Sequence, residues 1–147
     1  LKKLFSSKWK YKDLIEFHTN EKLFLMAHSI KGYSELGKLV AEGAKMDKKV
    51  LKEIYIKTFM EAIKHKATTK KNFNVLQHIY GYLKDKLTKQ EKEELFSIFD
   101  DYKNSLIPLI VPITLLKHHL LIYNIKYVLN QTYLSPSPKE LMLRNHS

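Results

Sequence analysis

The sequence predicts an all-α fold: a single compact domain of about seven or eight helices around a buried central helix over residues 106–122. Only four glycines and four prolines occur among 147 residues. Apolar residues recur every three or four positions almost throughout, which is the helical period, and no convincing strand pattern is present. A chain of this length suits one domain. We therefore expect one domain over residues 1–147. The absence of an initial methionine is compatible with a fragment or the C-terminal part of a longer protein.

The central helix is predicted from an apolar run that begins at Leu106. Ten of its first eleven residues are apolar or proline, so it has no polar face and is expected to be buried on every side. The run is shorter than the about 20 residues that span a membrane. Pro108 suits a helix start, and Pro112 implies a second start or a kink. The run ends in three basic residues, Lys117, His118 and His119.

Before this run, local signals place the other helices. The apolar spacing predicts helices over residues 8–28, 33–41, 48–66 and 72–86, and a fifth that follows Thr88. Asp47 is the expected N-cap of the third helix. Thr88 and Glu91 form a capping box at the start of the fifth. Its outer face has ordinary charged side chains, to which we assign no function.

After the run, a short helix is expected over residues 125–133. Ser137 and Glu140 then have the spacing of another capping box, with Pro138 in the first helical position. This predicts a last turn or two through Arg144. Glu140 and Arg144 are four residues apart and can pair on that helix, which gives the one arginine a structural role.

The charge of the chain favours a polyanionic partner. Twenty-five lysines and one arginine outnumber 15 acidic residues, for a net charge of +11. A lysine-rich proteome would explain the use of lysine but not the scarcity of acids. The charges are also segregated, because six acidic residues lie within residues 85–101 while long basic stretches contain none. We infer that one surface meets phosphates.

The helix over residues 72–86 has an unusual polar side. Asn74, Gln77, His78 and Gly81 share one face, where a merely solvated helix would have lysine and glutamate. Glycine inside a helix costs about 1 kcal/mol relative to alanine, so a close approach by a ligand or by another backbone would explain it. The alternatives of a ligand contact and a buried helix-to-helix contact are about equal from the face alone. The two lysines at residues 70 and 71 favour a ligand.

Several kinds of chemistry are excluded or disfavoured. The chain has no cysteine, which excludes disulfides, thiolate metal sites, iron–sulfur clusters and cysteine nucleophiles within it. The seven histidines show no HExxH-type spacing, and His118 and His119 point about 100° apart on a helix. We therefore expect no catalytic residue, metal or cofactor. The alternative is a metal-binding or enzymatic domain in which His18, His28, His78 and His118 converge.

The cellular location and a membrane partner are judged from two features, the N-terminal residues and the polar face over residues 74–81. No continuous apolar segment follows the basic first residues, so we see no signal peptide and expect a cytoplasmic protein. A basic module that binds proteins or a membrane surface is a third interpretation. The polar face over residues 74–81 argues against the membrane, where phenylalanine, tryptophan and leucine would be expected beside the lysines. The sequence does not predict an oligomeric state.

Four stretches resemble the YbgA-like domain, a family of unknown function. They are Phe17-His-Thr-Asn-Glu-Lys-Leu-Phe-Leu-Met-Ala-His-Ser29, Asn74-Val-Leu-Gln-His78 with Gly81-Tyr82, Leu106-Ile-Pro-Leu-Ile-Val-Pro112 through His118-His119, and Gln131-Thr-Tyr-Leu-Ser-Pro-Ser-Pro138 through Leu143-Arg-Asn145. The resemblance covers nearly the whole chain in order.

The resemblance implies a function in RNA metabolism. Members of the family occur alone or fused to domains that resemble thiouracil desulfidases, in which an iron–sulfur cluster removes sulfur from 4-thiouridine in tRNA. Since this chain has no cysteine, the resemblance implies only the half that holds tRNA for such a partner domain. Together with the charge, it predicts an RNA-binding accessory domain. The expected RNA contacts are His18, Lys22, Lys70, Lys71, Asn74, Gln77, His78, Lys117, His118 and His119.

Overall fold

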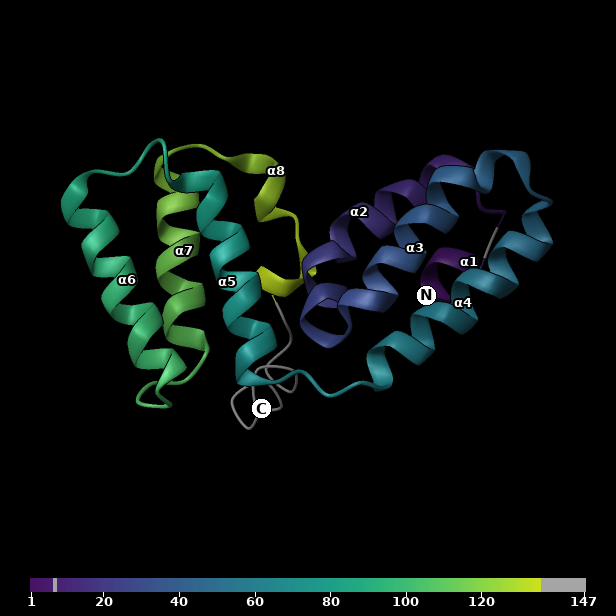
Figure 1. Ribbon diagram of the computed structural model, residues 1–147. Helices are drawn as coiled ribbons and strands as arrows, with labels where there is room; N and C mark the ends of the chain where they lie inside the picture. Colours follow the sequence, from purple (N-terminus) through teal and green to yellow (C-terminus); the bar gives the residue numbers. More distant parts are fainter. Residues whose placement is uncertain (7, 136–147) are drawn as a thin grey trace. The chain divides into compact units, whose positions relative to one another are not determined.

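The structure is a computed structural model that describes residues 1–6 and 8–135, and in these residues the all-α class is confirmed (Figure 1). The described residues form eight α-helices and two short 3₁₀ helices, η1 and η2. The α-helices are α1 (Lys2–Phe5), α2 (Tyr11–His28), α3 (Ile30–Glu42), α4 (Lys48–Lys64), α5 (Thr69–Leu83), α6 (Lys89–Lys103), α7 (Ile110–Ile122) and α8 (Lys126–Leu129). None of them is long and apolar enough to cross a membrane.

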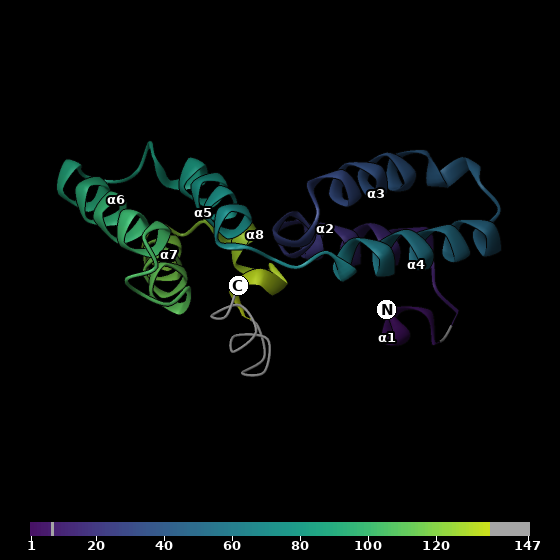
Figure 2. The same ribbon diagram turned by 60° about the horizontal axis from the view of Figure 1, so that its bottom comes forward.

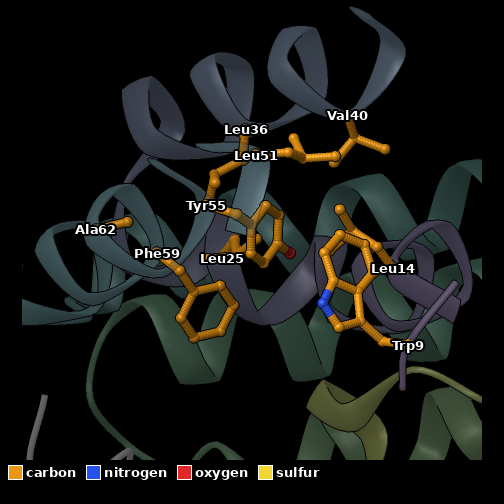
Figure 3. Packing of buried hydrophobic residues seen from close by; sticks show 9 residues of the cluster. All are labelled: Trp9, Leu14, Leu25, Leu36, Val40, Leu51, Tyr55, Phe59 and Ala62. Carbon is orange, nitrogen blue, oxygen red and sulfur yellow. The ribbon is translucent and has the colours of Figure 1, made fainter. Parts of the chain in front are cut away.

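The chain divides between Lys66 and Ala67 into two compact units. In the first unit α2, α3 and α4 pack against one another, and α1 contacts α2 (Figure 2). Figure 3 shows the buried residues of the core, which come from α2, α3, α4 and the segment just before α2. They are Trp9, Leu14, Leu25, Leu36, Val40, Leu51, Tyr55, Phe59 and Ala62. The helix over residues 106–122 therefore does not organise the whole chain, because the first unit has a core of its own.

Capping side chains define where the helices of the first unit begin. Ser29 has an extended backbone (φ −157°, ψ 111°) that separates α2 from α3, and its Oγ accepts a 3.0 Å hydrogen bond from the Gly32 backbone N–H. The expected cap at Asp47 is confirmed, since its Oδ2 accepts from the Val50 backbone N–H at 3.3 Å. Helix α2 begins at Tyr11 rather than at residue 8. Helix α1 was not predicted.

In the second unit α5, α6 and α7 each pack against the other two, and α8 packs against α7. The predicted capping box is confirmed: Thr88 Oγ1 accepts from the Glu91 backbone N–H at 3.1 Å, and Glu91 Oε1 accepts from the Thr88 backbone N–H at 2.8 Å. The predicted helix over residues 125–133 is instead two short pieces, α8 and η2 (Thr132–Leu134). The predicted last turn, from Ser137 to Arg144, lies outside the described residues.

The apolar run forms α7 only from Ile110 onward, so the predicted helix start at residues 106–108 is wrong. The prediction that the run is buried on every side is wrong as well. Leu109, Ile113, Leu116 and Leu120 are buried, whereas Leu121 is 63% exposed. Val111, Thr114 and Ile122 are exposed as well. The helix packs on α5, α6 and α8, and its exposed side combines the apolar Val111, Leu121 and Ile122 with the polar Thr114 and His118. Pro112 lies in the first turn, where its missing N–H removes no hydrogen bond within the helix, so no kink is needed.

Candidate nucleic-acid interface

The start of α5 places two lysines at the positive end of a helix. Thr68 is the N-cap, and its Oγ1 accepts a 3.2 Å hydrogen bond from the Lys71 backbone N–H. The helix therefore begins at Thr69, three residues before the predicted start at residue 72. Lys70 and Lys71 lie in the first turn instead of in a preceding loop, and Lys70 is exposed. Basic groups are unfavourable at this end of the helix dipole, and an anion bound there would offset that cost.

The two predicted faces of α5 are both present. Val75, Leu76, Ile79 and Leu83 are fully buried. On the opposite side all four residues of the predicted polar face are exposed, namely Asn74, Gln77, His78 and Gly81. The face is thus open to a partner along two turns of the helix.

Gly81 decides between the two interpretations of this face. A Cβ atom added to Gly81 would meet no atom within 4 Å in the described part of the chain. No neighbouring helix approaches it there, so the alternative of a buried helix-to-helix contact at this position is wrong. A side chain at position 81 would therefore fit without any movement of the described residues around it.

Two tyrosines that were not among the predicted site residues extend the face. The ring of His78 lies edge-on to that of Tyr82, with centroids 5.6 Å apart, and Tyr82 lies edge-on to Tyr127 at 5.5 Å. Tyr82 is 39% and Tyr127 is 66% exposed. Tyr82 follows His78 by four residues, so its position was available from helical spacing. Tyr127 comes from α8, and only the tertiary structure brings it beside α5.

His18 is a correction, because it is a core residue of the first unit. It is 5% exposed, and its Nδ1 lies 3.1 Å from the hydroxyl of the buried Tyr55. Burial, with a smaller contribution from the positive charge of Lys22, lowers the pKa of His18 to about 4. The ring is therefore neutral at pH 7 and does not reach RNA from the surface. Lys22 itself is exposed on α2; both residues belong to the first unit, and the other eight predicted contacts belong to the second.

The basic end of α7 is divided between surface and core. His118 is exposed and Lys117 is half-buried. His119 is a second correction, because it is 5% exposed and its Nδ1 lies 3.4 Å from Glu91 Oε2. This is an ion-pair distance rather than a well-formed hydrogen bond, and neither ring nitrogen has a hydrogen-bond partner within the described residues. His119 therefore belongs to the interior of the second unit.

Glu91 is occupied by structural contacts. Besides capping α6, its Oε1 accepts a 2.5 Å hydrogen bond from the hydroxyl of Tyr123. The backbone hydrogen bond from Thr88 and then the one from Tyr123 hold the pKa of this carboxyl below its usual range. The hydrogen bond between Tyr123 and Glu91 also raises the pKa of the Tyr123 hydroxyl. A carboxylate engaged in this way joins α6 to the end of α7.

The histidines do not form a metal centre in the described part of the chain. His28 Nδ1 lies 2.8 Å from the backbone oxygen of His65, which joins the ends of α2 and α4. Across residues 1–6 and 8–135 no group of three or more histidine or carboxylate side chains is placed to hold a metal ion. The alternative of converging histidines thus has no geometric support there.

Comparison with known proteins gives the family. The family model described as "Protein of unknown function (DUF1722)" matches residues 22–138. The uncharacterized protein YbgA of Escherichia coli (strain K12) is 27% identical over 135 residues, which cover 90% of this chain and 79% of that protein. No solved structure matches significantly. The resemblance to the YbgA-like domain is confirmed, and the chain belongs to the DUF1722 family.

Proposed function

We propose that the chain is an RNA-binding module whose contact surface is the exposed side of α5 together with the tyrosine of α8. The observation that carries the proposal is the composition of this surface. Two amides, an imidazole and a bare glycine lie on one exposed helix face, and two partly exposed tyrosine rings continue it. Folded RNA is recognised through its shape, its 2′-hydroxyls and unstacked bases. The amides can form hydrogen bonds with 2′-hydroxyls and base edges, and the exposed rings can stack on the bases.

The lysines supply the electrostatic part of binding. Lys70 and Lys71 lie one turn before Asn74, so phosphates and sugars of one strand can meet both groups. Each phosphate neutralised releases counterions, which gives a log–log salt slope of about −0.7 to −0.9 per contact. Lys117 and His118 at the end of α7 are further candidates in the same unit.

The identity of the RNA and of the partner rests on the family resemblance. We propose that the chain holds tRNA for a 4-thiouridine desulfidase domain, either fused or separate. The chain itself contributes binding and orientation and no catalytic step, and the partner supplies the iron–sulfur cluster. This activity would place the protein in the cytoplasm.

Fluorescence anisotropy of labelled tRNA tests the proposal. The titration is run from about 50 to 200 mM salt, a range over which generic phosphate contacts lose most of their affinity. Duplex DNA and unstructured RNA serve as competitors. A preference for tRNA that persists at about 150 mM salt is the expected result. Equal and steeply salt-dependent binding to all three would show that the charge is generic and would remove the proposal.

A charge reversal locates the surface. The double variant Lys70→Glu/Lys71→Glu should weaken tRNA binding and reduce the salt slope by about 1.4 to 1.8, the value for two phosphate contacts. Lys38→Glu/Lys45→Glu changes the net charge equally at exposed positions of the first unit and is the matched control. Equal losses in both double variants would place binding elsewhere.

A further inference from the structure

A cleft lies between α5 and α6 on the second unit, beside the proposed RNA surface. Its volume is about 260 Å³, and seven residues line it. Phe73, Gln77 and Tyr80 come from α5 at helical spacing. Phe96, Phe99, Asp100 and Lys103 come from α6. Pockets for drug-sized ligands hold about 300–1,000 Å³, so this cleft suits one planar ring system.

The walls of the cleft are aromatic and the rim is polar. Tyr80 packs against Phe96 with centroids 5.0 Å apart and edge-on to Phe99 at 6.4 Å. Phe99 is buried, but Phe96 is 51% exposed and presents its ring to the solvent. Such walls suit stacking with a flat ligand. Gln77, Asp100 and Lys103 are exposed around them and offer an amide, a carboxylate and an ammonium group.

The position of Lys103 favours a neutral ring with an anionic group over a cation as the ligand of this cleft. Aromatic rings beside a carboxylate also suit a cation. Here, however, the ammonium group of Lys103 already lies 5.3 Å from the centroid of the Phe73 ring. A second cation would have to displace this ammonium group from the Phe73 ring. A neutral ring attached to an anionic chain would be attracted, because its phosphate pairs with Lys103 while the ring stacks on the walls.

We propose that this cleft binds one unstacked guanine of the RNA. Guanine presents two adjacent N–H donors, N1–H and the N2 amino group, on its Watson–Crick edge. An ionised carboxylate accepts hydrogen bonds only, so Asp100 matches these donors. Gln77, whose amide both donates and accepts, serves the remaining edge. Because Gln77 also belongs to the polar face of α5, the cleft is continuous with the proposed RNA surface. This inference rests on the proposed function.

The test uses the 147-residue chain and two probes. The first is guanosine monophosphate, titrated into isotope-labelled protein and followed by NMR, with adenosine monophosphate for comparison. We expect shifts at the Gln77 side-chain amide and around Asp100, and tighter binding of the guanine nucleotide. Asp100→Asn should abolish that preference, because the affinity for guanosine monophosphate should fall by a factor of about 5 to 150, the range for one bidentate base contact. Glu94→Gln removes an exposed charge of α6 outside the cleft and should change nothing.

The second probe is labelled RNA, measured by anisotropy. Phe96→Ala removes a stacking wall that is half exposed, and it should weaken RNA binding about 5- to 150-fold. Circular dichroism shows whether Phe96→Ala is folded. If that variant does not fold, Asp100→Asn, which keeps the size and shape of the side chain, tests the cleft instead. RNA binding that depends on Lys70 and Lys71 but not on Phe96 or Asp100 would overturn the guanine site and leave the proposed function standing.

The remaining outcomes separate the two proposals further. Nucleotide shifts confined to the cleft in a protein that binds no RNA would overturn both the RNA-binding function and the assignment of the cleft to a guanine of RNA, and would leave a site for free nucleotides. Equal shifts by both mononucleotides, unaffected by Asp100→Asn, would overturn the guanine assignment. Tetramethylammonium tests the cation alternative, and shifts at the cleft with this probe alone would show that the aromatic walls bind cations.

Discussion

The hydroxyl of Tyr133 donates a 2.7 Å hydrogen bond to Oδ1 of Asn72, and both residues are fully buried. This bond joins η2 to the first turn of α5 across 61 residues of sequence. It fixes the turn that also contains Lys70 and Lys71. The proposed RNA surface therefore depends on a contact that no local sequence signal reveals.

Tyr133→Phe should destabilise the second unit by about 1–3 kcal/mol. The substitution leaves the Asn72 Oδ1 buried without the hydrogen bond from Tyr133. A buried acceptor without a donor costs more free energy than the net gain from a typical hydrogen bond. Urea unfolding followed by circular dichroism measures the change. Tyr127→Phe removes a hydroxyl from a largely exposed ring and should stay within about 0.5 kcal/mol of the parent. Similar losses in both variants would contradict the importance of the buried bond.

Acid should destabilise the first unit through His18. The folded pKa of about 4 lies below the ordinary 6.5, so the unfolded chain binds more protons in that window. The free energy of unfolding should therefore fall as the pH drops from 6.5 to 4, by about 3 kcal/mol from this residue at 1.36 kcal/mol per pH unit. Trp9, the one tryptophan, lies in the core of this unit and its fluorescence reports unfolding. His18→Asn should lose this pH dependence, whereas His78→Asn at an exposed position should retain it.

Gly32→Ala should destabilise the contact between α3 and α4 by about 1–3 kcal/mol. A Cβ atom at Gly32 would lie 2.5 Å from the Cβ of Ala62, and overpacking of this kind outweighs the helix-propensity gain of about 1 kcal/mol. Trp9 fluorescence in urea measures it. The double variant Gly32→Ala/Ala62→Gly should recover part of the loss. No recovery would mean that the two helices do not meet at this point.

Gly81→Ala should have opposite effects on stability and on binding. The position is exposed in the middle of a helix and a Cβ there meets nothing within 4 Å, so alanine should stabilise the fold by about 0.5–1 kcal/mol. If RNA approaches the bare backbone, its affinity should fall. Thermal unfolding and tRNA anisotropy measure the pair. A stabilised variant with unchanged affinity would remove Gly81 from the interface.

Tyr127→Ala should weaken RNA binding about 5- to 150-fold, since stacking of one base on an aromatic ring contributes about 1–3 kcal/mol. Tyr127→Phe should retain most of the affinity, because the ring rather than the hydroxyl provides the stacking surface. Leu121→Ala removes an equally exposed apolar side chain from α7 and serves as the control. A loss in the leucine variant as large as that in Tyr127→Ala would indicate a general apolar contact.

The sequence by itself determined the all-α class, the approximate positions of the longer helices and the two faces of α5. Caps and apolar spacing act within a few residues along the chain, so Asp47, Thr88 and Glu91 were assigned correctly. The exposed polar side of α5 followed from the same local spacing. The family, too, was recognised from short motifs in order along the chain.

Only the tertiary structure decided which polar side chains are buried and which residues from different helices meet. His18 and His119 have polar side chains that a sequence places at the surface, but packing encloses them beside Tyr55 and Glu91. Tyr127 joins the face of α5 because α8 returns to it. The aromatic cleft arises where α6 packs beside α5, on a helix whose outer face was expected to meet only solvent. Such contacts depend on the packing of helices that are distant in sequence, and periodicity within one helix does not specify its neighbour.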